Sequence, residues 1–152
     1  PRIIALNNMV FYLQVLFYMA GLVTLVYMTL DTKNTKLYLL LLALSIIPVI
    51  FSTTRFWLLY PLSFVLFLYI SLVFFESYHE KRNIMTLVTF TAFLLLALSR
   101  VEYIFAAKEA IHFIFNDNHG MHFVVGRIIE AIAYLLLLFN LVMVMKHEQK
   151  KK

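Results

Sequence analysis

Residues 84–107 read IMTLVTFTAFLLLALSRVEYIFAA, a run of 24 residues with only two charged side chains, Arg100 and Glu102. A helix that crosses the hydrocarbon of a membrane needs about 20 mostly apolar residues. The run has this length and composition, and charged residues flank it on both sides. It therefore predicts a membrane-spanning helix.

The chain contains four further apolar runs of spanning length, at 8–30, 37–53, 56–75 and 121–145. They lack the alternation of polar and apolar residues that is typical of a transmembrane β-strand. A helix also satisfies its own backbone polar groups inside lipid. The sequence therefore predicts an all-α integral membrane protein: a single transmembrane domain over 1–152, built as a five-helix bundle, with a basic tail at 146–152.

The composition agrees with a lipid environment. Of the 152 residues, 63% are hydrophobic and 14% are charged, whereas a soluble domain has about 45–50% and about 25%. This excludes a soluble enzyme, and it excludes a nucleic-acid-binding module despite the net charge of +5. Because the chain has no cysteine, disulfides, cysteine-ligated zinc and iron–sulfur clusters are excluded as well.

Lysine and arginine are distributed unevenly between the two sides of this arrangement, and the side with more of them is expected to be cytoplasmic. One side carries three, namely Arg2, Arg55 and Lys108. The other carries eight, namely Lys33, Lys36, Lys81, Arg82, Lys146, Lys150, Lys151 and Lys152. We therefore expect the protein in the cell membrane with its N-terminus outside and its C-terminus in the cytoplasm.

Four ionisable residues lie inside the last two predicted spans: Arg100, Glu102, Arg127 and Glu130. Each costs about 2.5–3.5 kcal/mol to insert near the centre of a spanning helix. At about 1.5 Å of rise per residue, Arg100, Arg127 and Glu130 lie roughly 10, 9 and 14 Å below the outer boundary. Two cations and two anions at similar depth predict a charge network between the two helices.

The helical positions of these residues set limits on the pairing. Arg127 and Glu130 are three residues apart and share a helix face. Arg100 and Glu102 are separated by about 200° around the helix axis, so we expect one of them to face another span or another protein. The first span, which carries Asn7, Asn8 and Gln14 near the same outer layer, is a candidate internal partner. The network is interpreted as structural, as completed by a neighbouring subunit, or as a functional site.

The loop between the last two spans, 108–120, is rich in metal-ligating side chains. Its Glu-x-x-His has the spacing of carboxylate-bridged metal sites in helical bundles. Histidine with methionine suits copper, and histidine with carboxylates suits zinc or iron. The candidate ligands are Glu109, His112, Asp117, His119 and His122.

Two other interpretations of this loop stay open. The histidines are also typical of a water boundary, where they cap or line a loop, and they suit a proton-handling role. Haem is not expected, because His79 and His147 lie at the opposite, cytoplasmic surface.

The sequence contains no P-loop, Rossmann glycine pattern or hydrolase nucleophile motif. We therefore expect an accessory or structural subunit of a larger membrane-embedded complex, non-catalytic by itself, with lipid and other integral membrane subunits as partners. One alternative is a metal-binding component of a membrane oxidoreductase, with its site at the outer face. A second alternative is a membrane sensor module whose outer loop detects a ligand.

Overall fold

The structure is a computed structural model that describes residues 2–30, 34–51, 58–111 and 119–149. Within these ranges the chain is all-helical, as predicted, and contains no strand. The helices are α1 (Arg2–Thr29), α2 (Thr35–Phe51), α3 (Leu59–Lys81), α4 (Ile84–Ile111) and α5 (His119–Gln149).

The helices run past the ends of the apolar stretches. α3 continues through the charged residues after Phe75 and ends only at Lys81, because charged residues such as Glu and Lys are good helix formers outside hydrocarbon. Arg82 then adopts a left-handed conformation with φ of 45°. The side chain of Asn83 accepts a hydrogen bond from the backbone N–H of Met85 at 3.1 Å, which caps the start of α4. The connection between α3 and α4 is therefore a sharp turn.

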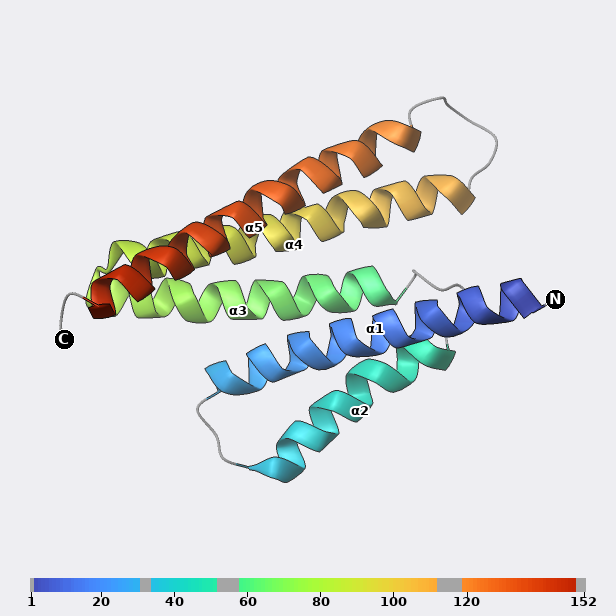
Figure 1. The fold of residues 1–152 in the computed structure, drawn as a ribbon, viewed down its shortest axis with the longest axis horizontal. Helices are drawn as coiled ribbons and strands as arrows, with labels where there is room; N and C mark the ends of the chain where they lie inside the picture. Colours follow the sequence, from blue (N-terminus) through green and yellow to red (C-terminus); the bar gives the residue numbers. More distant parts are fainter. Residues whose placement is uncertain (1, 31–33, 52–57, 112–118, 150–152) are drawn as a thin grey trace.

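Consecutive helices run in opposite directions, and the start of α1 and the end of α5 lie at opposite ends of the bundle (Figure 1). α3 packs along α4, and α4 packs along α5. α1 packs on α3, and α2 packs on α1. The pair α1 and α2 thus joins the other three helices mainly through the contact of α1 with α3.

The core combines large apolar side chains with small ones. Leu96 and Ile70 are each only 1% exposed and belong to a cluster shared by α1, α3, α4 and α5. Ala92, Ser99 and Ala133 are fully buried. Small side chains at helix contacts let backbones approach closely, which is how helices associate where lipid removes the hydrophobic driving force.

Four helices are long and apolar enough to cross a membrane: α1, α3, α4 and α5. α2 is shorter, with 17 residues, so the count of five spans stays a prediction. α5 is only 11% buried over its apolar window. Its outward-facing side chains include Ile128, Leu135, Leu138, Phe139 and Val142. This face is suited to lipid or to another helix.

Candidate functional site

The carboxylate of Glu130 on α5 is the centre of a buried polar cluster. Its Oε1 accepts a hydrogen bond from Nη2 of Arg100 on α4 at 2.6 Å, and its Oε2 accepts one from the Tyr103 hydroxyl at 2.7 Å. The side chains of Arg100 and Glu130 are only 8% and 11% exposed. This ion pair therefore joins α4 to α5 inside the bundle.

A further donor, Tyr134, and a further cation, Arg127, come from α5 itself. The Tyr134 hydroxyl lies 3.3 Å from Oε1 of Glu130, and Nη1 of Arg127 lies 3.6 Å from Oε2. Residues three and four positions apart share a helix face, so both side chains reach Glu130 from their own turns. The carboxylate is surrounded by donors, an environment that stabilises its ionised form.

Arg100 brings α1 and α3 into the same site. Its guanidinium carbon lies over the rings of Tyr18 on α1, Phe67 on α3 and Tyr103 on α4, at 5.5, 5.6 and 5.3 Å from the ring centroids. Aromatic faces attract a cation, most strongly when water is excluded. Arg100 is therefore held by three rings as well as by Glu130.

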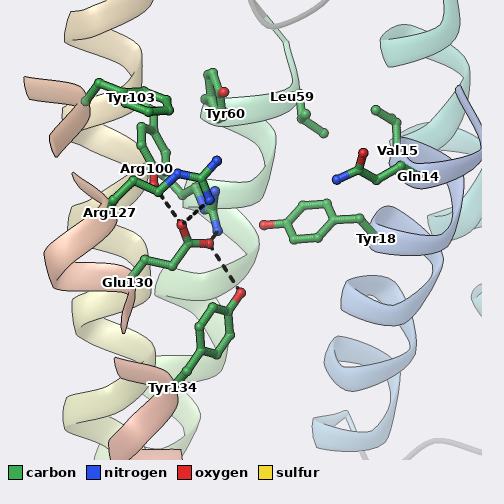
Figure 2. A pocket seen from close by; sticks show the side chains of 11 residues that line it. Gln14, Val15, Tyr18, Leu59, Tyr60, Arg100, Tyr103, Arg127, Glu130 and Tyr134 are labelled. Carbon is green, nitrogen blue, oxygen red and sulfur yellow. Dashed lines mark hydrogen bonds and ion pairs between the residues drawn. The ribbon is translucent and has the colours of Figure 1, made fainter. Parts of the chain in front are cut away.

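A cavity of about 550 Å³ lies beside this cluster, between α1 on one side and α4 and α5 on the other (Figure 2). Its lining combines two arginines and a glutamate with tyrosines and a few apolar side chains. The lining residues are Gln14, Val15, Tyr18, Leu59, Tyr60, Arg100, Tyr103, Phe123, Arg127, Glu130 and Tyr134.

Two buried polar atoms at this site have no hydrogen-bond partner among the described residues: Nε of Arg100 and the hydroxyl of Tyr18. In Figure 2 the Tyr18 side chain extends from α1 across the cavity toward the cluster around Glu130. A buried polar group without a partner is costly, and more so where no water is present. Both atoms are covered by protein rather than open to the cavity, so the group that a bound molecule would reach is the exposed guanidinium of Arg127.

The close approach of α4 and α5 at this level depends on Gly126. A Cβ atom at this position would lie 2.8 Å from Cε1 of Tyr103 and 3.3 Å from Cβ of Glu102. Glycine is thus the residue that lets α5 lie against α4, and this contact positions Tyr103 beside Glu130.

Glu102 does not join the cluster around Glu130. Its Oε2 lies 2.8 Å from Nδ1 of His122 on α5. The expectation that either Arg100 or Glu102 turns away from α5 is therefore wrong, because both contact α5 side chains. The α4–α5 contact is wide enough for the long Arg100 side chain to reach Glu130 at one edge while Glu102 meets His122 at the other.

The predicted metal ligands are only partly described. His112 and Asp117, and the side chains of Glu109 and His119, lie outside the described residues. His122 is described and contacts Glu102. Among the residues that the structure describes, no group of three or more histidine, cysteine or acidic side chains is arranged to hold a metal ion. The metal site in this loop stays a prediction.

Sequence reasoning missed the tyrosines that complete the site. Tyr103 follows Arg100 by three residues, and Tyr134 follows Glu130 by four. A tyrosine three or four residues from a charged residue inside a span lies on the same helix face, and this spacing could have identified both tyrosines. Tyr18 on α1 carries no such local signal, since its place beside Arg100 depends on how α1 packs. Gln14, named from the sequence as a candidate partner, lines the same cavity.

Comparisons of this chain with protein-family models, with curated proteins and with solved structures gave no match.

Proposed function

We propose that this chain is a multi-pass protein of the cell membrane that binds a small molecule in a cavity within the membrane. The cavity volume of about 550 Å³ falls in the range of about 300–1,000 Å³ that is usual for ligand sites. Such sites combine an apolar lining with a few convergent polar groups. The lining described above has both.

The observation that carries this proposal is the meeting of three charged side chains, Arg100, Arg127 and Glu130, in the lining of this cavity. Ionisable side chains inside a membrane are rare, and they mark ligand or ion pathways more often than random surface positions do. A bound molecule would supply a partner for the guanidinium of Arg127, whose side chain is 65% exposed.

The proposed arrangement in the membrane has five spans, with the N-terminus outside and α2 as a short fifth span. Three observations support it: four helices of spanning length, opposite directions of consecutive helices (Figure 1), and the excess of lysine and arginine on one side. In this arrangement the cavity lies in the outer half of the membrane.

Native mass spectrometry of the protein, extracted in a mild detergent, tests whether a molecule is bound. We expect the wild-type chain to carry an additional small-molecule mass. Val15→Trp places a large ring in the cavity and should remove that mass. Val10→Trp, on the exposed side of the same helix, is the matched control and should keep it. A wild-type chain that shows only its own mass, identical to Val15→Trp, would contradict the proposal.

A second candidate function is that of an accessory subunit in a larger membrane complex. It is favoured by α5, which is only 11% buried over its apolar window and presents an apolar face that another helix could cover. The pairing of Arg100 and Glu102 counts against this function, because both charges already have a partner within the chain. The same mass spectra test this function: a stable lone monomer after mild extraction would count against it, and a reproducible heteromeric mass would support it.

A further inference from the structure

We propose that the molecule bound in this cavity is an anionic amphiphile, with a compact carboxylate or phosphate head held by Arg127 and an apolar chain directed toward the membrane. This inference rests on the proposed function, which states only that the cavity binds a small molecule. It adds the charge, the shape and the orientation of the ligand.

The charges that line the cavity do not cancel. Among the described residues that line the cavity, the formally charged ones are Arg100, Arg127 and Glu130, two positive and one negative. Glu130 is closest to Arg100, at 2.6 Å, and lies 3.6 Å from Arg127. The charge of Glu130 is thus neutralised mainly by Arg100, and one positive charge is left over at Arg127. A cation in a medium of low dielectric constant favours a bound anion.

Arg127 is also the more accessible of the two arginines. Its side chain is 65% exposed, whereas that of Arg100 is 8% exposed. It is held in place by the rings of Tyr103 and Phe123, with its guanidinium carbon 5.8 and 5.2 Å from their centroids. A guanidinium presents a planar fork of N–H donors that matches a carboxylate or a phosphate. Arg127 is therefore oriented by two rings and accessible to a ligand.

The hydrogen-bonding groups of the cavity also favour an anion. The guanidinium of Arg127 carries only donors, and its side chain is 65% exposed. Among the described lining residues Glu130 is the one carboxylate, and both of its oxygens already accept hydrogen bonds. Such a site is matched by a head group that only accepts, as an ionised carboxylate or phosphate does. An amine or ammonium head has the opposite hydrogen-bonding character.

The apolar part of the ligand follows from the rest of the lining and from the helix arrangement. Val15, Leu59 and Phe123 contribute apolar surface to the cavity. α1 packs on α2 and α3, and α5 packs on α4, whereas the described residues of α1 and α5 make at most a weak contact. The cavity is therefore bordered laterally by two helices that pack little against each other. In the proposed arrangement this border faces lipid, so an apolar chain has a path from the membrane to the site.

The estimated depth favours a compact head. Arg127 lies about 9 Å below the outer boundary, at about 1.5 Å per residue along the helix. A single carboxylate or phosphate monoester can be drawn to this depth by one guanidinium, whereas a large zwitterionic head would bring a second charge with it. The ligand class is therefore a long-chain carboxylate or alkyl phosphate.

Equilibrium binding of radiolabelled oleate to the purified chain in a neutral maltoside detergent tests this inference. Three competitors separate the contributions: methyl oleate has the chain without the charge, acetate has the charge without the chain, and dodecyl phosphate has the other anionic head. We expect oleate to bind with one molecule per chain and dodecyl phosphate to compete with it. Methyl oleate and acetate should each bind at least tenfold more weakly than oleate.

Variants of α5 residues test whether Arg127 binds the head group. Arg127→Gln should weaken oleate binding at least tenfold, and Arg127→Lys should weaken it less because the charge is kept. Lys146→Gln removes the same charge from the other end of the same helix and should leave the affinity unchanged. Because the Arg127 side chain is mostly exposed, its replacement should leave the thermal stability close to that of the wild type. Thermal unfolding of the same samples measures this.

The outcomes separate this inference from the proposed function. Equal binding of oleate and methyl oleate, unaffected by Arg127→Gln, would overturn the anionic head while Val15→Trp still showed that the cavity is used. Acetate binding as tightly as oleate would overturn the apolar chain. If no probe binds, and the wild-type chain carries no additional mass, the proposed function fails together with the inference.

Discussion

Arg100 and Glu130 form a 2.6 Å ion pair between α4 and α5, and both side chains are about nine-tenths buried. Arg127 is closer to Glu130 in sequence, but it lies 3.6 Å away and is mostly exposed. The two arginines therefore have different roles. Arg100 is a structural partner of the carboxylate, whereas Arg127 is the cation that remains accessible in the cavity.

We predict that Arg100→Leu destabilises the protein strongly, because it leaves Glu130 buried with its closest cation removed. Breaking a buried ion pair by removing one partner costs about 3–5 kcal/mol. The double variant Arg100→Leu/Glu130→Leu should recover much of this loss, since two apolar side chains can replace a buried pair at small cost. Chemical unfolding in detergent micelles measures both.

Arg127→Leu is the matched comparison for this prediction and should cost clearly less than Arg100→Leu. A double variant less stable than Arg100→Leu alone would show that the pair does not account for the loss. Equal losses for the two arginines would contradict the distinction between them.

We predict that Gly126→Ala destabilises the α4–α5 contact, because the new Cβ would lie 2.8 Å from Cε1 of Tyr103. Forcing an extra carbon into a packed contact costs about 1–3 kcal/mol. Gly21→Ala is the control, since a Cβ there meets no atom within 4 Å and alanine is a better helix former by about 1 kcal/mol. Thermal unfolding of the two variants should therefore shift in opposite directions, and a loss at Gly21 equal to that at Gly126 would assign the effect to glycine in general.

Another polar contact joins α4 and α5 farther along the two helices. Nδ2 of Asn140 on α5 donates to Oγ1 of Thr89 on α4 at 2.6 Å. Hydrogen bonds between membrane helices average about 0.6 kcal/mol and reach about 1.7. A double-mutant cycle with Asn140→Leu and Thr89→Val should give a coupling in this range. Thr91, whose hydroxyl donates within its own helix to Leu87, should show no coupling with Asn140 when it is changed to valine.

The proposed topology is testable with single cysteines, because the chain has none of its own. We predict that Asn116→Cys, in the predicted outer loop, reacts with a membrane-impermeant maleimide in intact cells. Asn34→Cys, an exposed residue at the start of α2, should react only after the membrane is opened. Labelling of both cysteines in intact cells would exclude five spans with the N-terminus outside.

The helices could be predicted from the sequence largely because hydrocarbon demands long apolar runs. The predicted start at Ile84 coincides with the start of α4, since Asn83 both ends the polar turn and caps the helix. The end of α3 at Lys81 could not be predicted in this way. Charged residues end an apolar run but not a helix, so hydropathy does not locate this boundary.

For the site, the sequence identifies the charged residues but not which of them pair. Arg100 and Glu130 could be identified from the sequence because charge inside a span is costly and therefore conspicuous. Their pairing could not be chosen over that of Arg127 with Glu130, because it depends on how closely α5 approaches α4. The contact of Tyr18 with Arg100 could not be predicted either, because tyrosine is also common at membrane interfaces.

The way in which α1 is attached has a consequence for the order in which the protein is built. α1 packs on α3, and its Tyr18 ring lies against Arg100 on α4. During synthesis this N-terminal hairpin precedes α3, so it has no docking surface until α3 has entered the membrane. Arg100 arrives later still, and the ring of Tyr18 covers it only once the hairpin has docked. The shielding of Arg100 by Tyr18 therefore depends on a hairpin that is made before α3 and α4 and docks after both have been inserted.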